Sequence, residues 1–168
     1  FRKRRHGTSS ATLSTHRFIV STQNHDQVGN RLMGERLTRL TDFNGAKLAA
    51  GIVLLSPYLP MLFMGEEYGD PAPFLYFVSH SDPGLVEAIR RGRAEEFKSF
   101  NWNTDPPDAF AEETFNCCII NPELRYQGQH RVLYDYYQTL LRLRRSLPAL
   151  TTANRADIRV TGYEREQV

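Results

Sequence analysis

The sequence predicts an α/β fold in which short parallel strands are joined by a helix. A β-branched run at 17–21 precedes a polar stretch at 23–31. A helical pattern begins near residue 41, and a second short apolar run at 61–64 precedes another polar stretch at 66–70. Strand, polar loop, helix, strand and polar loop is the order of one βαβ unit, which places both polar loops on the same face of the sheet.

The first strand and the helix after it have clear local signals. Residues 17–21 include Phe18-Ile19-Val20, a composition that favours a strand. Thr41 or Asp42 is a natural N-cap, and Ser56-Pro57 ends the helix. We expect much of this helix to be buried, because apolar residues recur at helical spacing and broaden into a wide face: Phe43, Ala46, Ala49, Ala50, Ile52, Val53, Leu54 and Leu55.

Pro60 and Gly65 bound the second apolar run, Met61-Leu62-Phe63-Met64. A four-residue apolar strand of this kind suits a parallel strand that is covered on both faces. Glu66 and Glu67 follow it, where a ligand-binding role and a hydrogen-bonded loop anchor are both open, with the anchor favoured.

The rest of the chain alternates loops and helices. An aromatic loop at 71–82 leads to a helix at 84–98, and a short helix is possible at 108–115. The pattern of the helix at 129–145 is the strongest, and Pro148 stops it. One face of that helix carries Leu133, Tyr136, Tyr137, Leu140 and Leu141.

A domain boundary is expected near residue 150. Residues 1–150 would form one domain, and residues 151–168 the start of a C-terminal β domain. Ile158–Thr161, with Tyr163, is the strand-like segment that suggests this second domain.

Composition narrows the class of protein. The net charge of +2 creates no global field for polyanions, so the basic run at 2–5 is interpreted as a solvated loop and no nucleic-acid partner is expected. No stretch approaches the ~20 apolar residues of a membrane span, so no membrane partner is expected.

Cys117 and Cys118 are interpreted as thiols in a reducing cytoplasm, where we expect the protein to be located. His80 and His130 lack ligand-spaced partners, so no metal is expected.

The stretch Gln23–Arg31 is the most informative part of the chain. Its Asp26 stands among His, Gln and Asn residues just after a strand, where a parallel α/β barrel keeps its chemistry. The stretch resembles the last active-site motif of the α-amylase family of glycoside hydrolases, in which a strand ends in His-Asp. With Gln-Val-Gly-Asn-Arg after the Asp, it is most similar to the malto-oligosyltrehalose trehalohydrolase branch.

Three further segments carry the same resemblance, in the right order and spacing. Residues 62–68 resemble the family's eighth strand and its loop, 73–77 the aromatic loop of the trehalohydrolase branch, and 140–150 the last barrel helix. The resemblance implies that residues 1–150 are the C-terminal portion of a catalytic (β/α)8 TIM barrel, with its last two strand-helix units. Such a barrel needs about 250 residues, so we expect a piece of a longer enzyme, in keeping with a start at Phe1 and an end at Val168.

The resemblance also implies residue roles. Asp26 matches the carboxylate that stabilises the transition state, and His25 matches the histidine that hydrogen-bonds the same sugar ring. Gln27, Asn30 and Arg31 would contact substrate beyond that ring, and Gly29 would let the loop turn tightly. The substrate would be malto-oligosyltrehalose or a related α-glucan oligosaccharide, cleaved by water, without a cofactor, at the α-1,4 bond next to its terminal trehalose.

The nucleophile and the acid/base of a retaining glycosidase would lie upstream of Phe1, in the remainder of the barrel, so we expect this chain alone to be inactive. Two alternatives stay open. One is another α-amylase-family enzyme, such as a glycogen branching enzyme, and the other is a non-catalytic carbohydrate-binding or interaction module. Phe74, Tyr76 and Phe77 could stack on sugar rings or fill the space under their own loop.

Overall fold

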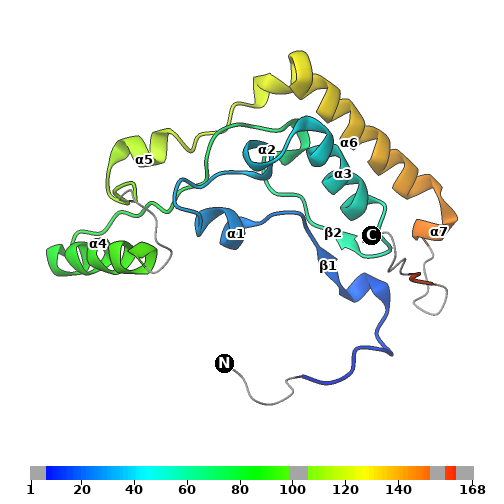
Figure 1. Cartoon of the computed structure of the whole chain (residues 1–168), viewed down its shortest axis with the longest axis horizontal. Helices are drawn as coiled ribbons and strands as arrows, with labels where there is room; N and C mark the ends of the chain where they lie inside the picture. The colour runs from blue at the N-terminus through cyan, green and yellow to red at the C-terminus, as the bar shows by residue number, and fades with distance from the viewer. Residues whose placement is uncertain (1–6, 99–105, 152–157, 162–168) are drawn as a thin grey trace.

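The computed structural model describes residues 7–98, 106–151 and 158–161, and within these it is mostly helical with one small parallel sheet (Figure 1). Strand β1 (Ile19–Val20) pairs in parallel with β2 (Leu59–Pro60). The predicted strand-helix-strand order is therefore confirmed. In chain order the helices are η1 (Thr15–Arg17), α1 (His25–Gly29), α2 (Leu37–Leu40), α3 (Phe43–Leu54), η2 (Glu66–Tyr68), α4 (Pro83–Lys98), α5 (Glu112–Asn116), η3 (Pro122–Tyr126), α6 (Gly128–Ser146) and α7 (Pro148–Thr151).

The second strand lies two residues earlier than the sequence predicted. The Leu59 amide donates to the Phe18 carbonyl at 2.9 Å, and the Met61 amide donates to the Val20 carbonyl at 2.8 Å. Pro60, between them, has no N–H, and its nitrogen faces away from β1, where a proline is tolerated. The prediction of a strand at 61–64 is wrong. Hydrogen bonding to β1 ends at the Met61 amide, and residues 61–64 form no strand.

A short helix replaces the polar loop predicted at 23–31. The Asn24 side chain accepts a hydrogen bond from the Gln27 amide at 3.1 Å, which makes Asn24 the N-cap of α1. Val28 in this helix is buried and anchors the helix to the rest of the protein. The cap and this apolar anchor stabilise one helical turn directly after β1.

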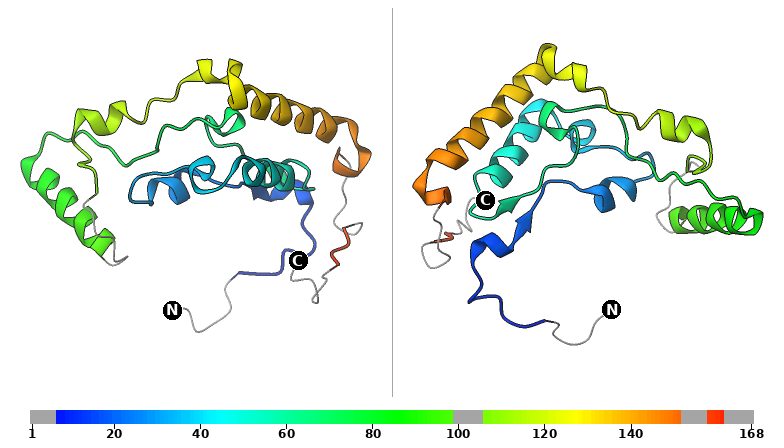
Figure 2. Two further views of the ribbon diagram at one scale, coloured as in Figure 1. Left: turned by 45° about the horizontal axis from the view of Figure 1, so that its top comes forward. Right: turned by 180° about the vertical axis from the view of Figure 1, so that it is seen from behind.

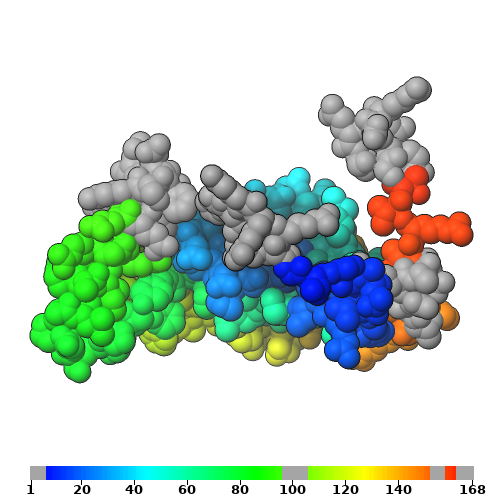
Figure 3. Space-filling model, turned by 90° about the horizontal axis from the view of Figure 1, so that it is seen from below, coloured from blue at the N-terminus to red at the C-terminus, as the bar shows by residue number. Residues whose placement is uncertain are grey.

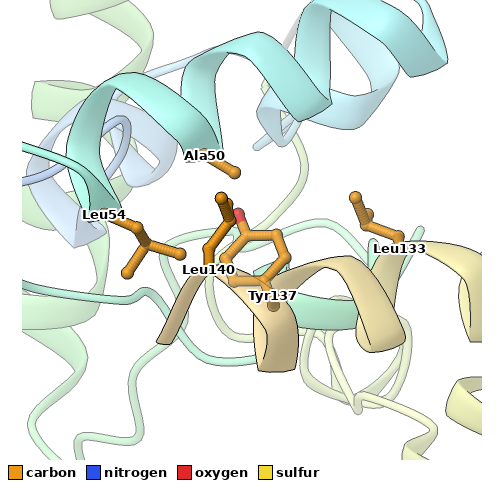
Figure 4. Packing of buried hydrophobic residues seen from close by; sticks show 5 residues of the cluster. All are labelled: Ala50, Leu54, Leu133, Tyr137 and Leu140. Carbon is orange, nitrogen blue, oxygen red and sulfur yellow. The ribbon is translucent and has the colours of Figure 1, made fainter. Parts of the chain in front are cut away.

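Helices α3 and α6 pack side by side and form the apolar core (Figure 1). Asp42 caps α3 as predicted, because its carboxylate accepts from the Gly45 amide at 2.7 Å. Figure 4 shows side chains of both helices pointing toward one another in this core, which consists of Ala50, Leu54, Leu133, Tyr137 and Leu140.

The apolar face of α3 is only partly covered. Ile52 is 65% exposed and Leu48 is also exposed, although the spacing predicted that Ile52 would widen the buried face. Within the described residues, α6 covers one side of α3 and leaves the opposite side open to solvent.

Arg144 ties the end of α6 to the end of α3. Its guanidinium donates to the carbonyl oxygens of Leu54 at 2.9 Å and Ser56 at 2.5 Å, and also to that of Tyr58. Leu54 ends α3 and the other two residues follow it, so no further helical turn donates hydrogen bonds to these carbonyl oxygens. One side chain therefore fixes the turn that leads into β2.

Helices α4 and α5 lie at the opposite end of the molecule from α7 (Figure 2), and α4 forms that end in the space-filling view (Figure 3). The predicted helix at 84–98 is confirmed as α4, and the possible helix at 108–115 is found slightly later as α5. Arg90 binds Asp108 with two hydrogen bonds of 2.8 and 3.1 Å, which joins α4 to the segment before α5.

The expected C-terminal β domain stays a prediction. Ile158–Thr161 are described and have no strand, whereas 152–157 and 162–168, which include Tyr163, lie outside the described residues. The basic run at 2–5 lies outside them as well.

Candidate functional site

The polar motif opens onto a pocket of about 250 Å3. Three parts of the chain surround it: helix α1, the loop after η2, and helix α4. The residues that line it are His25, Asp26, Gly29, Asn30, Phe74, Leu75, Tyr76, Phe77 and Arg93.

His25 and Asp26 present their side chains to solvent at this pocket. The His25 Nε2 atom lies 3.2 Å from the Asp26 Oδ1 atom, and the two side chains are 71% and 77% exposed. Both residues stand in the first turn of α1, directly after β1, because Asn24 caps the helix there. An exposed carboxylate beside an imidazole, with a pocket in front of them, can accept and donate hydrogen bonds to the hydroxyl groups of a ligand.

The other predicted site residues divide into two groups. Gly29 and Asn30 line the pocket, whereas Gln27 and Arg31 do not. Gln27 is exposed, and Arg31 pairs with Glu35 through an Nε–Oε2 contact of 3.2 Å. The described structure therefore brings four of the six residues together at one pocket.

Gly29 does not form the tight turn that the sequence predicted. It is the last residue of α1, and a Cβ atom added there would lie 3.5 Å from the Phe74 ring, which is ordinary contact. Behind Phe74, the backbone requires a glycine at Gly34, which has φ of +57°. A Cβ on Gly34 would lie 2.6 Å from the Phe74 carbonyl oxygen, so only glycine permits this approach.

Three aromatic side chains form one wall of the pocket, and each has a neighbour. Phe74 packs edge-on against Phe63 with ring centroids 5.2 Å apart, and Phe77 packs against Phe115 at the same distance. The Arg93 guanidinium lies over the Tyr76 ring, 4.9 Å from its centroid. Tyr76 and Phe77 keep exposed surface, so the wall is braced and also accessible.

Arg93 reaches the pocket from α4, which the sequence did not indicate. The only sequence signal for a role of Arg93 is its position on the basic side of that helix, and a charged helix face is usually just solvated. No sequence spacing links Arg93 to Tyr76, because the loop between them has no regular structure.

A buried polar network lies beneath the motif. The Gln23 side chain donates to a Glu66 carboxylate oxygen at 3.2 Å and accepts from the Leu37 amide at 3.0 Å. The Tyr137 hydroxyl donates to the other Glu66 oxygen at 3.5 Å. Glu66 is 4% exposed, and these bonds anchor the loop after β2 to the segment after β1 and to α6, in agreement with the favoured interpretation. Burial raises the pKa of the Glu66 carboxyl, and the hydrogen bonds that it accepts offset only part of this effect.

The raised pKa of Glu66 predicts a pH-dependent cost to folding. The charged form is the one that burial disfavours, so the cost is absent below the unfolded pKa and fully present above the raised folded pKa. Relative to Glu66→Gln, the wild-type protein is therefore expected to lose stability as the pH rises from about 4.5 through the folded pKa. Thermal unfolding across this pH range measures the difference between the two proteins.

The exposed Glu87→Gln variant on α4 is the matched control, and its curve should run parallel to that of the wild type. A constant difference between wild type and Glu66→Gln at every pH would contradict a titrating Glu66.

Within the described ranges, no group of three or more His, Cys, Asp or Glu side chains is arranged to hold a metal ion. Among the helices of those same ranges, none has the length and apolar character needed to cross a bilayer.

Comparisons with known proteins give the class of the protein. The chain superposes on a crystal structure of a candidate α-amylase from Salmonella typhimurium with a TM-score of 0.79 and 37% identity, over 89% of this chain and 25% of the other. No family model matches. The helices and the small parallel sheet therefore match part of an α-amylase fold, and the chain is homologous to glycoside hydrolases of the α-amylase family.

Sequence relatives narrow this class. The chain is 42% identical to the malto-oligosyltrehalose trehalohydrolase of Saccharolobus solfataricus over 145 residues, which are 86% of this chain and 24% of that protein. It is 40% identical to the enzyme of the same name from Rhizobium sp. over 165 residues, 95% of this chain and 27% of that one. The chain is thus homologous to a portion of the malto-oligosyltrehalose trehalohydrolases, and it spans about a quarter of their length.

Proposed function

We propose that this chain is the segment of a glycoside hydrolase that holds the transition-state carboxylate, in an enzyme that releases trehalose from malto-oligosyltrehalose. The observation that carries the proposal is the exposed His25-Asp26 pair at a pocket directly after β1. The relatives named as malto-oligosyltrehalose trehalohydrolases support the substrate class.

The parallel pair β1–β2, with α3 between the strands and α6 after them, corresponds in this proposal to the last two strand-helix units of a barrel. This proposal explains why the apolar side chains of Ile19, Leu48 and Ile52 are exposed, because neighbouring strands and helices of the longer protein would cover them. The same neighbours would supply the nucleophile and the acid/base, two carboxyl groups about 5 Å apart.

Asp26 would act on the sugar whose bond is broken. Its carboxylate would accept hydrogen bonds from ring hydroxyls, and these strengthen as positive charge develops on the ring. His25 would bind a hydroxyl of the same ring. The pocket beside them is lined by polar side chains such as Asn30 and by aromatic ones such as Tyr76. This mixture suits a second sugar ring, which would belong to the trehalose unit.

The test is product analysis with the full-length enzyme. Incubation with malto-oligosyltrehalose should release trehalose and a malto-oligosaccharide, while a malto-oligosaccharide without the trehalose end should be a much poorer substrate. New α-1,6 branches in an α-glucan, without trehalose release, would identify a branching enzyme instead. Oligosaccharide binding without any turnover would identify a non-catalytic module.

A further inference from the structure

Two neighbouring cysteines at the end of α5 place their sulfur atoms beside one oxygen atom. The Cys117 thiol donates to the Thr114 carbonyl oxygen at 3.3 Å, and the Cys118 thiol donates to the same oxygen at 3.2 Å. Both sulfur atoms therefore lie close to the same carbonyl oxygen at the end of α5. Both cysteines are free thiols; Cys117 is exposed and Cys118 is half-buried.

We propose that Cys117 and Cys118 form a binding site for trivalent arsenicals, thiophilic compounds that bind two thiols at once. Soft ligands such as thiols select soft elements. With an organoarsenic oxide, the two S–H bonds break and two As–S bonds form. The oxygen on arsenic leaves as water with both thiol protons, and neither sulfur nor arsenic changes its oxidation state.

Two observations favour this class of ligand over zinc or a simple alkylating agent. A structural zinc ion needs four ligands, and the described residues offer no group of three or more His, Cys, Asp or Glu that could hold a metal. Burial raises the pKa of the Cys118 thiol, which keeps it protonated and slow to react alone. Exposed Cys117 can form the first As–S bond, and Cys118 then closes the ring.

The site is linked to the pocket at the polar motif. The Leu75 amide donates to the Cys118 sulfur at 3.2 Å, and Leu75 stands between Phe74 and Tyr76 in the pocket wall. An arsenic atom on Cys118 draws on the same sulfur lone pairs, so the Leu75 amide should lose its acceptor. This inference does not depend on the proposed function.

The first test uses phenylarsine oxide and intact-mass spectrometry on the 168-residue chain, whose only cysteines are these two. We expect one phenylarsenic group per chain, stable in excess 2-mercaptoethanol and removed by 2,3-dimercaptopropanol. Cys117→Ser and Cys118→Ser should each abolish the monothiol-resistant adduct. Its absence from the wild-type chain, or its persistence in either single variant, would refute the site.

The second test separates a folded site from the reactivity of any unfolded Cys-Cys pair. Hydrogen exchange should show the Leu75 amide protected in the unmodified chain and exchanging faster in the adduct. Cys117→Ser treated with the same reagent is the control, and its Leu75 amide should stay protected. Equal protection with and without the adduct would overturn the link to the pocket.

Discussion

Asp26→Asn is expected to lower the kcat of the full-length enzyme by roughly a hundredfold or more, with little change in KM. The amide keeps the shape of the carboxylate and loses its charge. The carboxylate interacts mainly with the transition state, where the sugar ring becomes positive, and removing an interaction of that kind lowers kcat more than it raises KM. The loss of one charge-stabilising group of this kind costs about 3 kcal/mol.

Steady-state kinetics with malto-oligosyltrehalose measures this effect, with circular dichroism to confirm folding. Asp42→Asn is the matched control, because Asp42 is an exposed N-cap away from the pocket and asparagine caps equally well. His25→Ala should cost less than Asp26→Asn, since a neutral contact to a hydroxyl acts on ground and transition states alike. A kcat of Asp26→Asn within about threefold of the wild-type value would correspond to well under the ~1.4 kcal/mol of a tenfold change. The His25-Asp26 pair would then have no catalytic role and would only form the start of a helix.

The elements that the sequence predicted well are those with local signals. Asp42 and Pro57 mark the limits of α3, and the apolar face of α6 follows from its spacing alone. The position of Asp26 after a strand could be predicted for the same reason, because β1 and the polar stretch are neighbours in sequence.

Most of the features that the sequence missed depend on contacts between distant residues. The start of β2 is set by hydrogen bonds to Phe18 and Val20, about 40 residues earlier in the chain, and not by the apolar run at 61–64. The helical form of α1 depends on a cap at Asn24, a residue that is equally at home in a loop. Arg93 lies over Tyr76 only because α4 returns to the pocket. The β1–β2 hydrogen bonds and the Arg93–Tyr76 contact have no fixed sequence spacing, whereas the Asn24 cap is local.

Arg36 is the most important residue that only the structure could identify. It is 1% exposed, and its guanidinium donates to the carbonyl oxygens of Ala72 at 2.5 Å and Met64 at 2.6 Å. It also lies over the Phe63 ring, 4.9 Å from the centroid. Burial lowers the pKa of Arg36, and the charge of the equally buried Asp70 opposes that shift. One cation therefore holds together the residues that follow β2 and the start of the loop that forms the aromatic pocket wall.

Arg36→Met is expected to destabilise the protein by about 3 kcal/mol or more, the cost of breaking a buried charged arrangement by removing one partner. The methionine fills much of the space but leaves the Ala72 and Met64 carbonyls unpaired and the Asp70 carboxylate without its nearby cation. Chemical denaturation of the full-length enzyme measures the change. Arg31→Met is the matched control, since the Arg31–Glu35 pair is partly exposed and such pairs contribute about 1 kcal/mol or less. Equal losses in the two variants would mean that the Arg36 contacts are no stronger than a surface ion pair and do not hold the aromatic loop in place.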